Sequence, residues 1–444
     1  MKTTSIRIPA LSLLAVLQLG AQTLPRYFVT DLGPAGNPFS QAAWLNNSGV
    51  ITGVDTASDG TSHAILWYGF MLLDIGKPGL GGPNSSAGSI NEFGQVIGSA
   101  ETSSKDPNNE NFCGFGTGSQ CLPFLWQFGT MTALPTLKGS DGDFGTNAGW
   151  GQINNLGAIA GYAENSNRDP ECPGKKAVNG TGPQVLDFEP VIWGPAPGQI
   201  QQLPPLSGDS VGLALGINDR GEAVGISGRC ANTILPGFTA GPHAVLWESD
   251  GSVHDLGNLG GTVNTAMLAV GNGALAINNQ GEVTGLSALP GNQTFHPFLW
   301  TKGTGMRDLG VLPGDLVGAG LGMNNRGEIV GASISAPGPA SGNPRAYLWR
   351  NGVMSDLNAI VQQDAPLYLL TAFWINDSGD IVGFGATSGG EIHGFLAMPN
   401  RGAARLEDAA ASPASIAPRP LRDDARRLLL RRLRFGGSGA GPNR

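Results

Sequence analysis

Charged residues are scarce in this 444-residue chain, at 14% of the total, and only one long apolar run is present, near the N-terminus. So low a charge excludes the strongly charged disordered and coiled-coil classes. Because no other stretch approaches 20 apolar residues, the rest of the chain has no transmembrane-helix signal. No Gly-x-Ser-x-Gly, His-Glu-x-x-His or P-loop sequence occurs, so the sequence indicates none of the catalytic classes that these motifs mark.

Glycine and proline, in contrast, are abundant, with 70 and 31 residues respectively. Together they make up nearly twice the roughly 12% that is usual in globular chains. Long helices are therefore excluded. Since 40% of the residues are hydrophobic, the chain can still build a large core, and a turn-rich β protein is the class that remains.

The N-terminus has the layout of a secretory signal peptide. Lys2 and Arg7 precede the apolar run 8–20, and Ala21 offers a small residue for cleavage. A buried N-terminal helix is the alternative, but Pro9 and Leu24-Pro25 fit a processed leader better. We therefore predict that residues 1–21 are removed and that the protein is secreted, either extracellular or periplasmic.

Four cysteines are expected to form disulfides, because their number is even and the chain leaves the cytoplasm. Cys113 with Cys121 would close one loop, and Cys172 with Cys230 would join neighbouring loops. A zinc site is the alternative, but neither Cys-x2-Cys spacing nor neighbouring histidines are present.

Charge is distributed unevenly between the body and the C-terminal tail. Residues 22–400 have a net charge of −16, which argues against nucleic acid as a partner. Residues 400–444 are rich in Ala, Pro and Arg, with ten Arg against four acidic residues. Within them, residues 421–435 form either a basic amphipathic helix, through which the protein would contact a membrane, or part of a disordered tail. The clustering of the leucines favours disorder.

A short motif, Asn-x-x-Gly-x-x-x-Gly, occurs seven times in the chain. Asn and Gly tolerate positive φ and close tight hairpins, so each copy predicts a turn between two strands. The copies begin at Asn46, Asn91, Asn154, Asn218, Asn278, Asn324 and Asn376, at steps of 45 to 64 residues.

Two further short strands are predicted between successive Asn turns. The first ends in Leu-Trp or Ile-Trp, as in Phe298-Leu299-Trp300, and the second ends in Asp-Leu-Gly, as in Asp308-Leu309-Gly310. We name the four strands of a unit a, b, c and d, with the Asn turn between a and b. Seven four-stranded units predict an all-β fold, a seven-bladed β-propeller with antiparallel blades.

The chain ends support closure of the ring. Residues 27–33 match strand d without a preceding a, b or c, and the last unit stops after strand c at residues 394–397. The N-terminal strand would therefore complete the seventh blade of a propeller spanning residues 27–399, leaving no exposed sheet edge. An open β-solenoid is the alternative, but uneven repeat lengths and complementary ends argue against it.

The repeats resemble those of the HAF family of extracellular repeat proteins, whose units combine a His-Ala-Phe-Leu-Trp strand, an Asp-Leu-Gly strand and an Ile-Asn-x-x-Gly-x-Val-x-Gly hairpin. Residues 63–67 and 243–247 come closest to the first element. The resemblance covers residues 27–397 and implies secretion and a repeat fold, but no reaction. Ala133-Leu134-Pro135 and Gln202-Leu203-Pro204 depart from Asp-Leu-Gly, which puts a uniform role for that Asp in doubt.

One face of the predicted propeller carries the b–c loops and the links from strand d to the next strand a. The long b–c insertions, at about 102–121, 165–188 and 229–242, contain all four cysteines and lie in consecutive blades. Rigid clustered loops of this kind are suited to binding. The alternative is that the disulfides only protect the loops against proteolysis.

Three tryptophans lie outside the Leu-Trp repeat and are candidate ligand-binding residues. Trp44 and Trp374 each stand two residues before a turn Asn, in blades that become neighbours on closure, and Trp150 is the third. The pair would either stack on a sugar ring or fill the seam between blades 7 and 1, and the seam is the favoured interpretation.

Other polar candidates are weaker. Asp141 and Asp143 alternate with glycine, which suits calcium but is also common in ordinary loops. His63, His243, His296 and His393 recur at one offset, so we expect hydrogen bonding at a strand start rather than one metal site. Acid pairs for glycoside cleavage would come from Glu101, Glu164, Asp169 or Glu189, at a separation that sequence does not determine.

These observations predict an exported, monomeric scaffold that binds a polysaccharide or an extracellular protein through its loop-rich face. No cofactor is required by this interpretation, with calcium as the one candidate metal. The alternative is a secreted carbohydrate-active hydrolase or lyase on the same scaffold, because one fold can host both functions.

Overall fold

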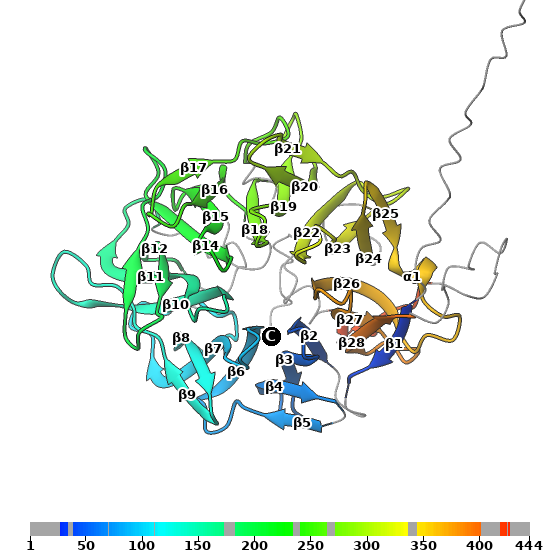
Figure 1. Ribbon diagram of the computed structural model, residues 1–444. Coiled ribbons are helices and arrows are strands. Elements are labelled where there is room, and N and C mark those ends of the chain that lie inside the picture. Colours follow the sequence, from blue (N-terminus) through cyan, green and yellow to red (C-terminus); the bar gives the residue numbers. More distant parts are fainter. Residues whose placement is uncertain are drawn as a thin grey trace, which may run out of the picture.

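The computed structural model describes residues 27–33, 39–69, 71–110, 112–172, 183–233, 240–263, 271–335, 344–400, 418–423 and 425–426. These residues form seven four-stranded antiparallel sheets around one central axis (Figure 1), and the short helix α1 (Leu357–Ile360) precedes the last blade. The predicted seven-bladed β-propeller is thus confirmed. The predicted signal peptide, residues 1–21, lies outside the described residues.

Blades 1 to 4 follow one another along the chain, each with its strands in the order a, b, c, d. Their strands are β2 (Ser40–Leu45), β3 (Val50–Thr56), β4 (Ser62–Tyr68) and β5 (Met71–Asp74); β6 (Gly81–Ile90), β7 (Val96–Lys105), β8 (Ser119–Gln127) and β9 (Thr130–Ala133); β10 (Phe144–Ile153), β11 (Ile159–Arg168), β12 (Leu186–Trp193) and β13 (Ile200–Gln202); β14 (Val211–Ile217), β15 (Ala223–Gly228), β16 (His243–Trp247) and β17 (Val253–Asp255).

Blades 5 and 6 repeat this order, and blade 7 joins the two ends of the chain. Strand β1 pairs antiparallel with β28 from Tyr27 opposite Pro399 to Asp31 opposite Phe395, so the N-terminal strand closes the ring as predicted. The strands are β18 (Gly273–Ile277), β19 (Val283–Ala288), β20 (Phe295–Thr301) and β21 (Gly305–Asp308); β22 (Val317–Met323), β23 (Ile329–Ile334), β24 (Arg345–Arg350) and β25 (Val353–Asp356); β26 (Tyr368–Ile375), β27 (Ile381–Ala386), β28 (Ile392–Pro399) and β1 (Tyr27–Asp31).

The two glycines of the repeated motif have different physical roles. The first, such as Gly281 with φ 78°, takes the left-handed conformation that closes the a–b turn. The second, such as Gly285, lies opposite an irregularity in strand a, where the register shifts between Ala274 and Ala276. A Cβ on Gly285 would overlap the carbonyl oxygen of Gly273, so only glycine fits.

The apolar core lies between the blades. Trp193 and Trp247, which end strands β12 and β16, are 1% and 0% exposed. Their indole N–H groups donate to the carbonyls of Pro135 and Pro204, which lie just after strand d of the preceding blade. The repeated tryptophans therefore join neighbouring blades.

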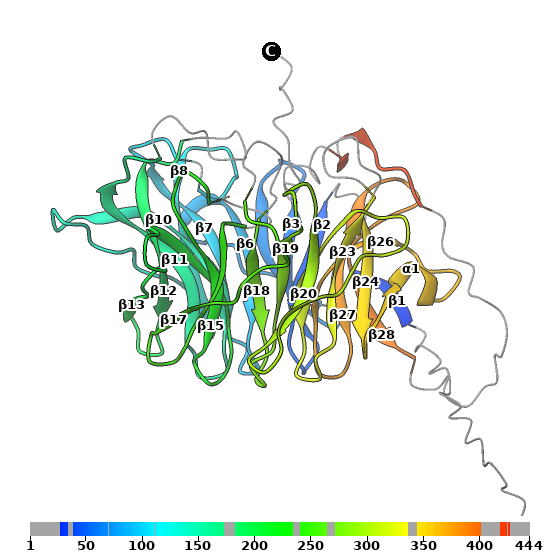
Figure 2. The same ribbon diagram turned by 90° about the horizontal axis from the view of Figure 1, so that it is seen from above.

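The two faces of the propeller differ in their loops (Figure 2). The a–b and c–d turns lie at one end, which we call the Asn-turn face, and the b–c loops and d–a links lie at the other, the loop-rich face. Among the described residues, no helix is long and apolar enough to cross a membrane.

Candidate functional site

Seven asparagine side chains form a closed ring at the Asn-turn face. Each Nδ2 donates a hydrogen bond of 2.9 to 3.3 Å to the backbone carbonyl of the turn asparagine in the next blade. The ring runs from Asn46 to Asn91, Asn154, Asn218, Asn278, Asn324 and Asn376, and from Asn376 back to Asn46. The turns thus close the propeller a second time, independently of strand pairing in blade 7.

Each ring asparagine also holds its own turn together, as Asn278 illustrates. Its Oδ1 accepts hydrogen bonds from the N–H groups of Gln280 and Glu282, both at 3.0 Å, and its Nδ2 donates to the Glu282 carboxylate at 2.7 Å. With the bond to the next blade, every donor and acceptor of this 4%-exposed amide is used. Aspartate would lose both donors, which explains why this position is asparagine in all seven repeats.

The residue after each ring asparagine belongs to a second ring, which we call the rim. Its side-chain oxygen accepts a hydrogen bond of 2.8 to 3.0 Å from the backbone N–H of the corresponding residue in the preceding blade. The rim consists of Asn47, Glu92, Asn155, Asp219, Asn279, Asn325 and Asp377. The sequence analysis missed the rim, although an amide or acidic residue after every turn Asn was the available signal.

A hollow opens on the axis between these rings and is lined by Trp44 and Trp374. It contains about 670 Å³ of space not filled by atoms, part of it open to solvent. The two indoles stack on each other, with ring centroids 4.1 Å apart and an interplanar angle of 25°. Each is half-buried. They therefore pack at the seam between blades 7 and 1 and also present indole surface to the hollow.

The residues two positions before each turn Asn lie at the propeller axis, and the sizes of their side chains determine how the centre is filled. This position is large in blades 1, 3 and 7, as Trp44, Gln152 and Trp374, and small in the other four blades. Gln152 reaches across the axis, where its Nε2 donates to the Leu275 carbonyl of blade 5 at 3.3 Å. The three large side chains thus form the floor of the hollow.

Trp150 lies away from this pair. Its ring packs over Gly88 of β6, where an added Cβ would overlap the indole. It does not line the axial hollow. Of the three candidate tryptophans, the structure thus brings together Trp44 and Trp374 only.

The recurring histidines on strand c pair with the aspartate of strand d in the same blade. His63, His243, His296 and His393 place Nδ1 2.9 to 3.1 Å from Asp74, Asp255, Asp308 and Asp31, respectively. In blade 6, Arg345 takes the histidine position and pairs with Asp356 at 3.2 Å. These contacts match the predicted hydrogen bonding at a strand start.

Blades 2 and 3 lack both members of the pair. Leu122 and Glu189 occupy the histidine position, and Ala133 and Gln202 occupy the aspartate position. The aspartate of Asp-Leu-Gly therefore acts as the hydrogen-bond partner of the histidine on the neighbouring strand, and blades that lack the histidine also lack the aspartate. In blade 3, Glu189 places an acid where other blades carry histidine or arginine.

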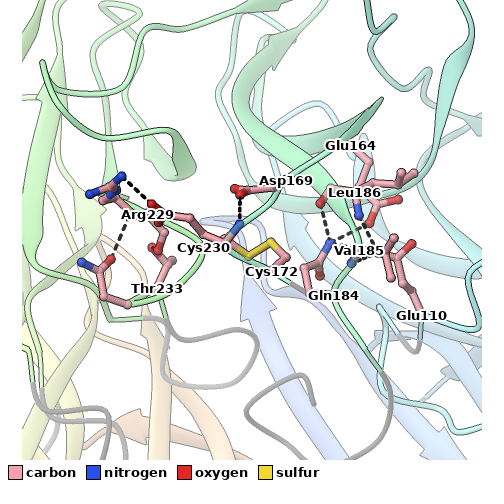
Figure 3. The surroundings of a disulfide bond; sticks show 12 residues. Glu110, Glu164, Asp169, Cys172, Gln184, Val185, Leu186, Arg229, Cys230 and Thr233 are labelled. Atoms are coloured by element: carbon pink, nitrogen blue, oxygen red, sulfur yellow. Dashed lines mark hydrogen bonds and ion pairs between the residues drawn. A yellow bond between two sulfur atoms is a disulfide. The ribbon is translucent and has the colours of Figure 1, made fainter. Parts of the chain in front are cut away.

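Two disulfides hold the insertions on the loop-rich face, and both predicted pairings are confirmed. Cys113 bonds to Cys121 within the blade 2 insertion, with Cα atoms 5.9 Å apart. Cys172 bonds to Cys230, joining the insertions of blades 3 and 4, with Cα atoms 5.4 Å apart (Figure 3). Since the four cysteines are all oxidised, the zinc alternative is excluded.

The four carboxylates considered for glycoside cleavage are all buried, with exposures of 0% to 8%: Glu101, Glu164, Asp169 and Glu189. Glu101 accepts hydrogen bonds from Asn84 and Thr117, and Glu164 accepts them from Thr146 and Asn147. A polymeric substrate has no access to such groups. None of the four can therefore serve as an open acid or base in this conformation.

Glu110, which the sequence analysis did not single out, lies beside Glu164 under the insertions (Figure 3). The Gln184 amide donates to both carboxylates, at 3.2 Å and 2.9 Å, respectively. Burial raises the pKa of Glu110 to about 7, against the opposing hydrogen bonds from the Leu186 and Val185 N–H groups. Burial, followed by the charge of Glu110, raises the pKa of Glu164 well above its usual range. The pair is an internal feature of the loop packing.

Asp141 and Asp143 lie on the exposed link between blades 2 and 3. Hydrogen bonds from the Ser166 hydroxyl and the Asp143 N–H lower the pKa of Asp141. Its carboxylate is thus used within its own loop. Calcium binding at these residues stays a prediction.

Parts of the C-terminal tail pack against blade 7 on the loop-rich face. The Arg419 guanidinium donates to the carbonyls of Ala365 and Ala386, at 3.1 Å and 3.4 Å, and Arg422 pairs with Glu391 at 3.2 Å. Ala425 is only 1% exposed. These described pieces of the tail are bound to the propeller, and the remainder of the predicted segment 421–435 lies outside the described residues.

No protein-family model matches the chain, and no curated protein matches it. Solved structures of low sequence identity are similar to the chain, among them the three that follow. The β-propeller domain of the Trilobed protease from Pyrococcus furiosus is 9% identical, with 85% of this chain and 96% of that chain covered and a TM-score of 0.44. Oligogalacturonate lyase from Vibrio parahaemolyticus is 12% identical, with 83% and 93% covered and a TM-score of 0.44.

The third is the extracellular domain of a protein from B. thetaiotaomicron, which is 8% identical with a TM-score of 0.43. The match covers 83% of this chain but 39% of that one, so this chain spans well under half the length of that extracellular domain. Such identities and TM-scores give no indication of this chain's ligand or activity.

Proposed function

We propose that this protein is an exported binding module that holds a sugar ring of a glycan in the axial hollow of the Asn-turn face, and not on the loop-rich face that the sequence analysis favoured. The stacked, half-buried pair of Trp44 and Trp374 is the observation that carries the proposal. Indole surface packs well against the apolar faces of sugar rings, and polar groups around a pocket orient such a ligand through its hydroxyls. The rim supplies amides and three carboxylates around the hollow.

Export rests on the sequence of residues 1–21 and on the two disulfides. Disulfides persist in oxidising compartments, which agrees with a secreted or periplasmic protein. The recurring His and Asp partners and the Asn turns are also the elements through which the chain resembles HAF repeats, and we include membership of that family in the proposal. The partner would be a polysaccharide or a glycosylated extracellular protein, bound by a monomer.

The burial of the loop carboxylates favours a binding function over a hydrolase or lyase activity. Glu164 is fully buried and Glu101 is 2% exposed. Glycoside cleavage needs two carboxyl groups that reach opposite sides of the scissile bond. Among the described residues of the loop-rich face, the four candidate acids do not offer such a pair.

The test uses the mature full-length protein with a panel of microbial and plant polysaccharides. Retention on the polymer and release of soluble fragments are both measured. We expect retention without fragments, weakened at least tenfold by Trp374→Ala, because loss of one indole removes half of the stacked surface. Trp150→Ala is the matched control and should bind as the wild type does, since Trp150 lies outside the hollow.

Circular dichroism and the melting temperature check that Trp374→Ala is folded, and Glu92→Ala on the rim offers a second variant that leaves the indole pair intact. Equal retention by the wild type and both variants would contradict the axial site. Fragment release would instead support the enzyme alternative.

A further inference from the structure

The wall of the axial hollow carries charge of one sign. Three rim residues are acidic, Glu92, Asp219 and Asp377, and the other four are asparagines. Among the described residues that line the hollow, none is Lys, Arg or His. Because the three acids belong to blades 2, 4 and 7, their carboxylates are distributed around the hollow rather than gathered at one point. A ligand in the hollow therefore lies in a negative potential that reaches it from several sides.

The rim carboxylates have hydrogen-bond partners, but these partners are neutral. All of their donors are backbone N–H groups and asparagine amides, such as the N–H and Nδ2 of Asn325, which both donate to Asp377 at 2.9 Å. Within the described part of the chain, no Lys, Arg or His forms an ion pair with any of the three acids. The hydrogen bonds thus fix the positions of the carboxylates and leave their charge in place.

Arginine is present on the Asn-turn face, but it is paired outside the hollow. Arg220 and Arg326 stand two residues after the ring asparagines of blades 4 and 6 and form ion pairs with Glu222 and Glu328. The Glu328 carboxylate also pairs with Arg350, at 2.5 Å. None of these arginines lines the hollow. The negative potential of the hollow is therefore not offset by a cation on its wall.

We infer, on the basis of the proposed glycan-binding function, that the hollow selects sugars by charge: it binds neutral and amino sugars and repels uronate and sulfated sugars. Glu92, Asp219 and Asp377 are the residues that determine this specificity. Like charges that face each other across an interface strongly disfavour binding, so the acids act by excluding the wrong ligand. The ammonium group of an amino sugar is attracted both by the carboxylates and by the face of an indole ring.

The test compares matched oligosaccharides that differ at one group per sugar. An oligogalacturonate is measured against its methyl ester, and a glucosamine oligomer against its N-acetylated form, by isothermal titration calorimetry with the full mature chain. The measurements are made at about pH 6 and about 0.02 M salt, where the rim charges are weakly screened. We expect the free acid to bind about tenfold more weakly than the ester, and the free amine about tenfold more tightly than the acetylated form. Both affinity ratios should shrink at about 0.5 M salt.

The double variant Asp219→Asn with Asp377→Asn removes two of the three rim charges. Asparagine already occupies this rim position in four blades, where its Oδ1 accepts the same hydrogen bond from the preceding blade, so the variant is expected to fold. Both affinity ratios should fall toward one. Asp250→Asn is the matched control and should keep both ratios, because Asp250 is exposed on a c–d turn of the same face and does not line the hollow.

The outcomes separate this inference from the proposed function. Equal binding of the acid and the ester, or ratios that survive the double variant, would overturn the charge selectivity and leave the glycan site standing. Absence of binding by all four oligosaccharides would contradict the glycan site itself and this inference with it.

Discussion

The two faces of this propeller satisfy their polar groups in opposite ways. On the Asn-turn face, seven copies of one turn join in two closed hydrogen-bonded rings, and acids such as Glu328 have cationic partners at Arg326 and Arg350. On the loop-rich face, the insertions of blades 2 to 4 bury acids such as Glu110 and Glu189 with oxygens that lack a donor. Repetition therefore produces a uniform, fully bonded surface, and departures from the repeat produce local chemistry.

The largest effect is expected on the loop-rich face, from loss of one of its two covalent links. Cys172→Ser with Cys230→Ser opens a sequence separation of 58 residues, whereas Cys113→Ser with Cys121→Ser opens one of 8. From loop-closure entropy we expect losses of roughly 4 and 2.5 kcal/mol in the free energy of unfolding. Urea denaturation of the two double variants measures both values. Equal losses would show that chain entropy does not dominate here.

The next largest effect should come from the Asn ring. Asn278→Ala removes all four side-chain hydrogen bonds and leaves the Asn324 carbonyl and the Glu282 carboxylate without this donor. We expect a loss of about 3 kcal/mol, because buried groups left unsatisfied cost more than the bonds themselves contribute. Gln280→Ala, an exposed change in the same turn, is the control and should cost less than about 0.5 kcal/mol. A similar loss in both variants would argue against the ring as the stabilising element.

The pH dependence of stability should have opposite signs on the two faces. Burial raises the pKa of Glu189 to about 8, so the folded state binds more protons than the unfolded state and the stability that Glu189 contributes is lost as pH rises from about 5 to 8. One fully shifted group contributes a slope of about 1.4 kcal/mol per pH unit. Glu189→Gln should flatten this slope in denaturation measured across that range.

Glu328 on the Asn-turn face should show the reverse. Burial opposes its ionisation, but hydrogen bonds from Arg326 and Asn324 and the charge of Arg350 lower its pKa overall. Its contribution is therefore present above its unfolded pKa and lost as pH falls through the folded value. Glu328→Gln should therefore lower the free energy of unfolding near pH 7, and the difference from the wild type should shrink as pH falls through the folded pKa. A difference that stays constant down to acid pH would contradict this assignment.

The smallest effect is expected for the histidine pairs of strands c and d. His296 meets Asp308 at 3.0 Å, but the Asp308 side chain is 43% exposed. Partly exposed pairs contribute little, so His296→Ala should cost less than about 1 kcal/mol. Thermal denaturation of His296→Ala and Asn278→Ala under the same conditions compares the exposed ion pair with the buried Asn ring. An equal loss of stability in the two variants would show that the exposed ion pair contributes as much as the buried ring.

Much of the architecture was predictable from the sequence because it repeats. The Asn-x-x-Gly-x-x-x-Gly copies marked every a–b turn, and residues 27–33 marked the strand that completes blade 7. Both disulfide pairings followed from the position of the cysteines in neighbouring insertions. The double role of Trp44 and Trp374, as seam and as floor of the hollow, depended on side-chain packing that the repeat does not specify.

The sequence by itself determined the number of blades, the turns and the closure of the ring, because these follow from local patterns that recur in order. Only the tertiary structure decided which groups from different blades meet. The ring joins asparagines 45 to 64 residues apart along the chain and then 330 residues apart at closure. Glu110, from the blade 2 insertion, meets Glu164 of strand β11 in blade 3, where the Gln184 amide donates to both carboxylates. Local sequence patterns do not predict such contacts, because the contacts depend on the paths of the loops and on burial.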